Sequence, residues 1–254
     1  MKKRKAGIVI FVIVLIITAV RIKSMDSHRI SGRILAENIA GPGMLRLVEQ
    51  SMQARARKTS VTEIAVKERK HPQAALTFDD GPDIRYTPLL LDGLKERNVR
   101  VSFFLLGEKV EQYPELVERM QKEGHLVGNH TYHHVQLNKL NETKAREEIL
   151  KTNNLIYETT GVYPLYLRPP FGAWKKNLEL CVEMLPVFWT IDTLDWKVQN
   201  TEKIVRTVQE QIEDGAIILM HDEYDTSVEA ALQVVDELKN QGYEFVTVDQ
   251  LILP

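Results

Sequence analysis

Short apolar runs alternate with amphipathic stretches from residue 74 to the end of the chain. The apolar runs predict strands at Ala74–Phe78, Val99–Leu105, His125–Asn129, Leu165–Arg168, Pro186–Thr190, Ala216–Met220 and Glu244–Thr247. The stretches between them predict helices at Thr87–Arg97, Pro114–Glu123, Thr143–Thr160, Thr201–Glu213 and Ser227–Gln241. Strands that alternate with helices pair in parallel through crossovers. The pattern therefore predicts an α/β fold built on a parallel sheet or barrel.

The N-terminus has a different pattern, because an unbroken apolar run, Ala6–Val20, follows four basic residues. A helix of this length spans about 22 Å, which is shorter than the roughly 30 Å hydrocarbon core of a bilayer. The run fits either the apolar region of a signal peptide or a short membrane span. No small-residue cleavage site follows it, so we expect residues 1–21 to be an uncleaved signal anchor.

The charges around this run predict the orientation of the chain. More positive charge precedes the run than follows it, which favours a cytoplasmic N-terminus and an extracytoplasmic remainder. We therefore expect a single-pass protein of the cell membrane, or a secreted protein if the segment is cleaved. Residues 22–71 are basic and contain the helix breaker Gly41-Pro42-Gly43, which is typical of a stalk or linker. This stalk is either a solvated spacer or a contact for anionic lipids or wall polymers.

Net charge and cysteine content exclude several classes of function. Residues 1–73 carry 15 basic and 5 acidic side chains, whereas residues 74–254 carry 18 basic and 30 acidic ones. An acidic domain repels phosphate backbones, so nucleic acid is not an expected partner. The single cysteine, Cys181, excludes an intrachain disulfide and a cysteine-rich metal site, and we expect it in the core.

Ionisable side chains gather where the predicted strands end. In parallel α/β barrels the active site lies at the carboxyl ends of the strands, so these segments are expected to meet. The segments are Asp79-Asp80-Gly81-Pro82, Asn129-His130-Thr131-Tyr132-His133-His134, Arg168-Pro169-Pro170-Phe171-Gly172, Asp192-Thr193-Leu194-Asp195-Trp196 and His221-Asp222.

Two of these segments predict a metal site. His130 and His134 are four residues apart, so on a helical turn both imidazoles point from one face and can share a metal. A carboxylate from Asp79-Asp80 completes a set of two histidines and one carboxylate, which leaves positions open for water and substrate. Adjacent residues in an extended segment point to opposite sides, so one aspartate can bind metal while the other accepts a proton. We expect His133 to be structural or to support the ligands without binding the metal itself, because it points away from the shared face.

In this order, the five segments resemble the motifs of the polysaccharide deacetylase family, the NodB-homology group of carbohydrate esterases. The resemblance covers about residues 72–254 and implies a distorted (β/α) barrel with a divalent metal, commonly zinc. It is carried by Thr77-Phe78-Asp79-Asp80-Gly81-Pro82, His130-Thr131-x-x-His134, Arg168-Pro169-Pro170-Phe171-Gly172, Asp192-Thr193-Leu194-Asp195-Trp196 and Leu219-Met220-His221.

The resemblance also implies a role for each matched residue at the metal site. Asp79 is similar to the catalytic base of the family, and Asp80, His130 and His134 match its metal ligands. Arg168 matches the residue that pairs with the base and orients it. An arginine beside Asp79 is expected to lower the pKa of that carboxyl.

On the other side of the site, the resemblance implies a general acid and a pocket. His221 would be the acid and Asp195 its partner, and a neighbouring carboxylate raises a histidine pKa. Trp196 and Leu219 would wall the pocket for the acetyl methyl group. Phe171 stands where the family more often has tyrosine. We expect little effect, because its backbone N–H is the group that would bind the oxyanion.

These expectations predict an enzyme that hydrolyses N-acetyl groups of an N-acetyl-hexosamine cell-wall polysaccharide. Peptidoglycan is the preferred substrate because of the extracytoplasmic tether. Three alternatives remain open at the level of sequence. They are an O-deacetylase of a polymer such as acetylated xylan, a non-catalytic envelope glycan-binding protein, and a metal-dependent phosphohydrolase.

Overall fold

The computed structural model describes residues 70–174 and 184–252. Residues from Arg69 to Pro254 belong to one compact unit. The predicted signal anchor, nearly all of the predicted stalk and Cys181 lie outside the described residues. None of the helices in the described ranges is long and apolar enough to cross a membrane.

The described chain contains strands and helices in alternation. The strands are β1 (Gln73–Asp79), β2 (Ser102–Leu105), β3 (Leu126–Asn129), β4 (Tyr166–Leu167), β5 (Leu185–Pro186), β6 (Ile191–Asp192), β7 (Ala216–His221) and β8 (Glu244–Phe245). The helices are α3 (Tyr86–Glu96), α4 (Gly107–Gln112), α5 (Pro114–Lys122), α6 (Glu142–Thr160), α7 (Asp195–Val198), α8 (Thr201–Gln211), α9 (Asp225–Asn240) and α10 (Val248–Ile252). Two single 3₁₀ turns, Leu137–Lys139 and Pro170–Gly172, lie between them.

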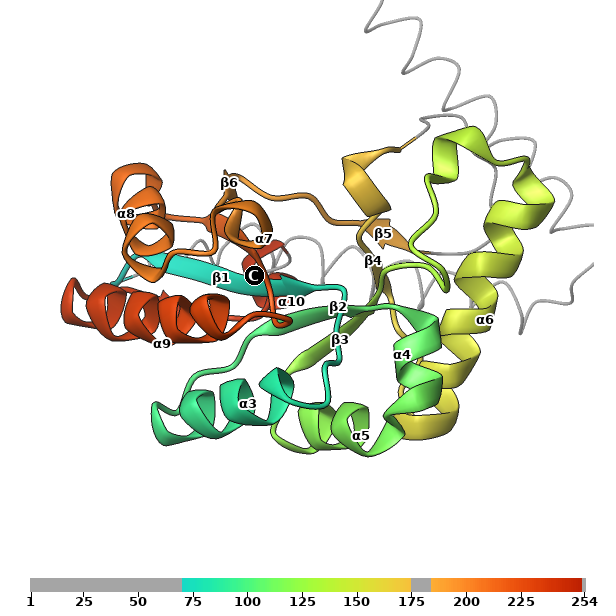
Figure 1. The fold of residues 1–254 in the computed structure, drawn as a ribbon, viewed down its shortest axis with the longest axis horizontal. Coiled ribbons are helices and arrows are strands. Elements are labelled where there is room, and N and C mark those ends of the chain that lie inside the picture. The colour runs from blue at the N-terminus through green and yellow to red at the C-terminus, as the bar shows by residue number, and fades with distance from the viewer. Residues whose placement is uncertain (1–69, 175–183, 253–254) are drawn as a thin grey trace, which may run out of the picture. The chain divides into compact units, whose positions relative to one another are not determined.

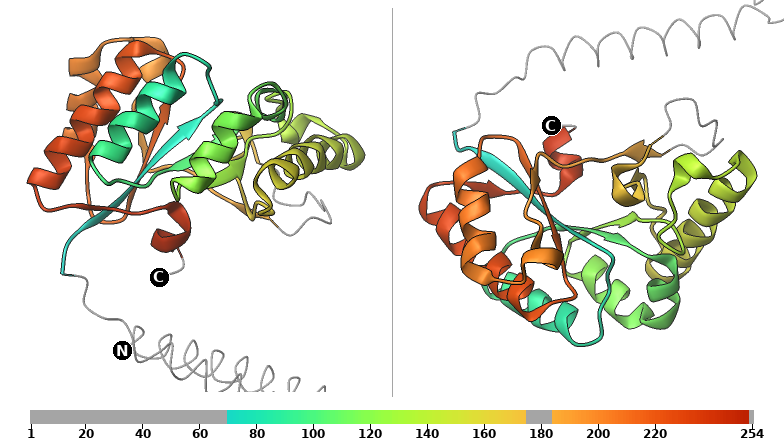
Figure 2. Two further views of the ribbon diagram at one scale, coloured as in Figure 1. Left: turned by 90° about the horizontal axis from the view of Figure 1, so that it is seen from below. Right: turned by 45° about the horizontal axis from the view of Figure 1, so that its top comes forward.

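All strand pairings among the described residues are parallel, and they form one sheet in the order β5-β4-β3-β2-β1-β7-β6 (Figure 1). Strand β8 pairs with the start of β1, which lies at the centre. Helices α8, α9, α3, α5 and α6 follow one another around the sheet, and each packs against the next (Figure 2). No pairing joins β5 to β6 among the described residues, so the sheet is open and curled. The expected (β/α) fold is confirmed, but without closure of the barrel in this part of the chain.

Alternate side chains of β1 point to the two opposite faces of the sheet. Ala74, Leu76 and Phe78 point to the main core, which helices α3 and α9 complete. The alternate residues Ala75, Thr77 and Asp79 therefore point to the inner, concave face. All six residues are buried, as expected for a central parallel strand covered on both faces. This alternation directs Asp79 toward the other strand ends.

Most predicted elements are confirmed, with shifts of a few residues at their ends. The predicted strand Pro186–Thr190 is wrong, because two short strands, β5 and β6, flank residues 187–190 instead. Helices α4, α7 and α10 were not predicted. Each spans only four to six residues, which is too short to show a helical period of apolar positions.

Candidate active site

The turn after β1 brings two aspartates to the carboxyl end of the sheet. Asp79 is the last residue of the strand, and register places it beside Phe104 of β2 and His221 of β7. Asp80 has a φ of 70°, in the left-handed region, so the chain leaves the strand direction at once. The two aspartates were expected to point to opposite sides, as adjacent residues of an extended segment do. This expectation is wrong, because Asp80 is not extended. The turn still gives the two carboxylates different partners.

His130 and His134 converge on Asp80 from a loop that follows β3. The Nε2 atoms of His130 and His134 lie 3.4 Å and 3.5 Å from Oδ1 of Asp80. The loop is not the helical turn that the spacing of the two histidines suggested. Thr131 and His134 have φ angles of 66° and 54°, and these left-handed residues curl the loop back on itself.

The geometry of these three residues fits a divalent metal. Their ligand atoms lie within 4.8 Å of one another. Two ligands of a tetrahedral zinc ion lie about 3.3 Å apart, given bond lengths of about 2.0–2.1 Å. The Asp80–histidine distances are close to this value, and Oδ1 of Asp80 is buried without a hydrogen-bond partner. The donor set of two imidazoles and one carboxylate suits zinc and leaves room for water and substrate.

The tautomer of His130 is also suited to a metal. Its Nδ1 lies 2.6 Å from the carbonyl oxygen of Arg168, so Nδ1–H donates and the Nε2 lone pair faces Asp80. Burial lowers the pKa of His130 to about 3, despite the opposing charge of Asp80. A neutral imidazole is the form that binds metals.

Asp79 pairs with Arg168, as predicted. Nη1 of Arg168 donates to Oδ1 of Asp79 at 2.8 Å and to the hydroxyl of Thr77 at 2.7 Å, and the arginine is fully buried. Burial raises the pKa of the Asp79 carboxyl above its ordinary value, and Arg168 lowers it by less. The expectation of a lowered pKa is therefore wrong in its net direction, because desolvation outweighs the arginine.

His221 and Asp195 form the second charged pair. Oδ1 of Asp195 lies 2.8 Å from Nδ1 of His221, and Oδ2 accepts from the backbone N–H of His221 and from the hydroxyl of Ser227. Burial lowers the pKa of His221, but the hydrogen bond and charge of Asp195, helped by Asp79 and Asp80, outweigh it and raise the pKa to about 9. The free Nε2 lies 3.8 Å from Oδ2 of Asp80, on the side of the site that faces the metal cluster.

The three predicted substrate-binding residues lie near these groups. Phe171 has a φ of 60° and 63% of its surface exposed, and its ring centroid is 4.4 Å from that of His134. Leu219 is buried and lies two residues before His221 on β7, so both point to the same face. Trp196 directly follows Asp195 and is about half exposed. A pocket for the acetyl methyl group between Trp196 and Leu219 stays a prediction.

His133 is structural, as predicted. Its Nδ1 lies 2.8 Å from Oε1 of Glu148 on α6, and it is not part of the Asp80–His130–His134 cluster. The carboxylate of Glu148 also accepts the backbone N–H groups of Tyr132 and His133. This role of Glu148 could not be read from its place in a helical sequence pattern.

Sequence reasoning placed Asp222, which directly follows His221, at a strand end but gave it no role. It is fully buried, and the hydroxyl of Thr87 donates to its Oδ2. Its Oδ1 has no partner and lies against Gly81, where an added Cβ would come within 2.5 Å of it. Burial raises the pKa of Asp222 to about 7. Its position at a strand end beside His221 was the available signal.

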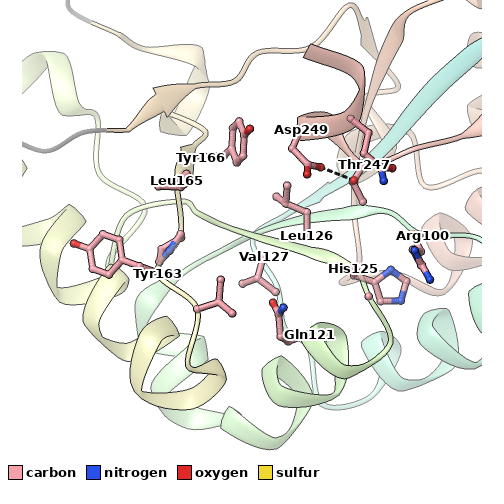
Figure 3. Close-up of a pocket in the computed structure, with 14 residues that line it drawn as sticks. Arg100, Gln121, His125, Leu126, Val127, Tyr163, Leu165, Tyr166, Thr247 and Asp249 are labelled. Carbon is pink, nitrogen blue, oxygen red and sulfur yellow. Dashed lines mark hydrogen bonds between the residues drawn. The ribbon is translucent and has the colours of Figure 1, made fainter. Parts of the chain in front are cut away.

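A pocket of about 280 Å³ lies elsewhere on the domain (Figure 3). It is lined at the amino ends of β3 and β4, where Leu126 and Tyr166 begin these strands, and His125 and Tyr163 add polar groups. None of the predicted site residues lines it. In parallel α/β folds of this kind the chemistry is placed at the opposite ends of the strands.

An Asp-His-His cluster flanked by an Asp–Arg pair and a His–Asp pair is typical of metal-dependent hydrolases. Comparison with known proteins then gives the family. The sequence profile described as "Polysaccharide deacetylase" matches residues 66–187. The chain belongs to the polysaccharide deacetylase family.

Individual relatives agree with this assignment. The peptidoglycan-N-acetylglucosamine deacetylase PgdA of Listeria monocytogenes serotype 1/2a is 42% identical over 185 residues, which cover 73% of this chain but only 40% of that protein. A peptidoglycan-N-acetylglucosamine deacetylase of Bacillus cereus is 40% identical over 186 residues, covering 70% of this chain and 68% of that protein. The structure of the peptidoglycan deacetylase PdaC of Bacillus subtilis matches with a TM-score of 0.70 and 41% identity, over 72% of this chain and 91% of that chain.

Proposed function

We propose that the protein is a metal-dependent N-deacetylase that removes acetyl groups from N-acetyl-hexosamines of peptidoglycan and releases acetate. The observation that carries the proposal is the convergence of three groups at the carboxyl ends of the strands. They are the Asp-His-His set of metal ligands, an Asp–Arg pair and a His–Asp pair. Relatives about 40% identical that are named as peptidoglycan deacetylases support the substrate class.

Asp80, His130 and His134 would hold the metal, with zinc the expected ion. When bound, the metal supplies Lewis-acid polarisation of the acetamide carbonyl and makes a water molecule more acidic. Asp79 would accept a proton from the attacking water as general base. Its Oδ1 is held by Arg168, whereas Oδ2 faces the metal cluster at 3.7 Å from Nε2 of His130. A raised pKa makes Asp79 a stronger base, closer to the working pH.

His221 acts as the general acid on the leaving group. The departing amine is a poor leaving group unless its nitrogen is protonated, so a proton donor is needed on that side of the acetamide. With a pKa of about 9, His221 is protonated at neutral pH and presents Nε2–H to the site. Asp195 fixes the ring through Nδ1 and compensates its charge. Phe171 would contribute its backbone N–H to the oxyanion, and Trp196 and Leu219 would contact the acetyl methyl group.

An ester substrate would fit the same machinery, so an O-deacetylase of a polymer such as acetylated xylan is the neighbouring possibility. Esters depend less on protonation of the leaving group than amides do. The complete His221–Asp195 pair therefore favours the amide. A non-catalytic glycan-binding protein would have no need of an intact base, acid and ligand set.

The test is acetate release from purified peptidoglycan by the full-length protein, first stripped of metal and then given zinc. We expect zinc-dependent release, and Asp79→Asn should reduce it by roughly 10²–10⁴-fold. Chromatography of the digested product would show which N-acetyl-hexosamine of peptidoglycan has been converted to the free amine. Release from acetylated xylan alone would establish the ester substrate. No release from peptidoglycan, chitin oligomers or acetylated xylan would contradict the proposal.

A further inference from the structure

The loop between the two histidine ligands is held in an unfavourable backbone conformation. Thr131 and His134 both have positive φ angles, although neither is glycine. A residue held in this region costs about 1–3 kcal/mol and persists only when the surrounding structure fixes it. The position of the His134 imidazole therefore depends on contacts that hold the loop.

Glu148 supplies such contacts from a different element, helix α6. Its Oε2 accepts the backbone N–H of Tyr132 at 3.1 Å and that of His133 at 2.9 Å. Its Oε1 lies 2.8 Å from Nδ1 of His133. The side chain is only 16% exposed, so water competes little for these hydrogen bonds.

Helix α6 holds this carboxylate rigidly. The next residue, Ile149, is fully buried in a core cluster, and its carbonyl accepts from Nδ2 of Asn129, the last residue of β3. The same Asn129 binds the backbone N–H of Thr131 through its Oδ1 at 2.7 Å. Strand, loop and helix are thus joined around the ligand loop, and Glu148 binds the two consecutive N–H groups that lie midway between the ligands.

We propose that Glu148 is a positioning residue of the metal site, which sets the affinity for zinc by fixing the 131–134 loop and with it His134. The proposal rests on the metal site of the proposed function. Residues that orient metal ligands typically change affinity by roughly 10–100-fold when they are removed.

The measurement is zinc affinity of the full-length apoprotein by competition with a chromogenic chelator, which does not depend on turnover. We expect Glu148→Ala to weaken zinc binding by roughly 10–100-fold. Glu148→Gln keeps an acceptor for both backbone N–H groups and an amide that can donate to His133. It should remain within about threefold of the wild type. His133→Ala should also remain within about threefold, because the backbone contacts carry the effect.

Two variants on the same helix serve as controls. Glu147→Ala removes the neighbouring, exposed glutamate, and we expect no change in zinc affinity. Asn141→Ala removes the N-cap, whose side chain accepts the N–H of Lys144 at 2.9 Å, and should lower the free energy of unfolding by about 1 kcal/mol. Its zinc affinity should match the wild type, which separates loss of helix stability from loss of positioning.

Wild-type binding that His134→Ala abolishes identifies the measured site. With the site identified, two results would overturn the role of Glu148 and leave the deacetylase proposal intact. One is wild-type zinc affinity in Glu148→Ala. The other is a loss of zinc affinity in Glu148→Gln or Asn141→Ala as large as that in Glu148→Ala. A wild-type protein that binds no zinc would overturn both.

Discussion

At the scale of single residues, the site contains two acid–base pairs in which hydrogen bonds and charges offset burial to different extents. Arg168 gives Asp79 one hydrogen bond, and desolvation outweighs it, so the pKa of Asp79 rises. Asp195 accepts three hydrogen bonds, two from His221 and one from Ser227, and its pKa falls although burial opposes this. The buried negative charge of Asp195, held by these hydrogen bonds, then raises the pKa of His221. One pair thus yields a strong base and the other a persistent acid.

This difference predicts how activity depends on pH. The acid form of His221 is lost as pH rises through its pKa of about 9, so the alkaline limb of kcat/KM should fall near there. Asp195→Asn removes the charge that raises this pKa, and burial then lowers it, so the alkaline limb should move to lower pH. The check is a pH profile of acetate release for both proteins. An alkaline limb that does not move would argue against His221 as the acid.

Asp222 predicts a pH dependence of stability. Its pKa is about 7 in the folded protein and near 3.8 when unfolded, so its contribution is fully present below pH 3.8 and is lost as pH rises through 7. Asp222→Asn removes this titration. Its free energy of unfolding should therefore improve relative to wild type between pH 4 and 8, by up to ~4 kcal/mol. Urea denaturation at pH 4 and at pH 8 measures the free energy of unfolding of both proteins. If the difference between Asp222→Asn and wild type is the same at both pH values, the prediction is contradicted.

At the scale of elements, strand β3 shows how packing and ligand placement are connected. Gly128 lies on this central strand, one residue before Asn129 and two before His130. A Cβ at Gly128 would come within 2.7 Å of the Phe104 ring and 3.1 Å of the carbonyl oxygen of Tyr166. The strand has no space for a side chain there, so its position relative to β2 and β4 is fixed by a close backbone approach.

Gly128→Ala should therefore lower the free energy of unfolding by about 1–3 kcal/mol, because the added methyl group overpacks the sheet. It should also weaken zinc binding, since β3 leads directly into the ligand His130. Gly161→Ala is the control. Gly161 has a positive φ but open space around its Cβ position, so alanine there should cost about 1 kcal/mol of backbone strain and leave zinc affinity unchanged. If Gly128→Ala binds zinc as tightly as Gly161→Ala does, the packing of β3 does not affect the metal site, and the prediction is contradicted.

The elements also show which predictions a local pattern supports. Helix α6 spans 19 residues and helix α9 spans 16, and both were recognised because several turns repeat the same apolar face. Strands β5 and β6 have two residues each and exist only through pairing with β4 and β7. No local sequence signal defines them, so the sequence predicted one strand where the structure has two.

At the scale of the whole molecule, the described domain is one unit whose candidate active site is assembled from segments far apart in the chain. Because the compact unit begins at Arg69, it should not need the preceding residues for its chemistry. A protein of residues 69–254 should retain zinc-dependent acetate release from soluble chitin oligomers within about threefold of the full chain. A large loss of activity would show that residues 1–68 contribute to the site or to its stability.

The same pair of proteins tests the proposed location. We propose that residues 1–21 anchor the protein in the cell membrane, with the catalytic domain extracytoplasmic. Cell fractionation should then find the full chain in the membrane fraction and the shortened protein in the soluble fraction. Full chain in the medium would indicate cleavage of the segment. Full chain in the cytoplasm would contradict the proposed location.

The sequence by itself determined the α/β class, most of the alternating elements and the polar strand-end segments that the structure brings together. Repeating apolar positions and strand-end polar segments are local properties of the chain, and parallel strands bring their carboxyl ends together whatever the details of packing. Only the tertiary structure decided the open sheet, the left-handed ligand loop, the raised pKa of Asp79 and the parts played by Glu148 and Asp222. Each of these depends on desolvation or on contacts between distant segments, and such effects arise only when the chain is packed.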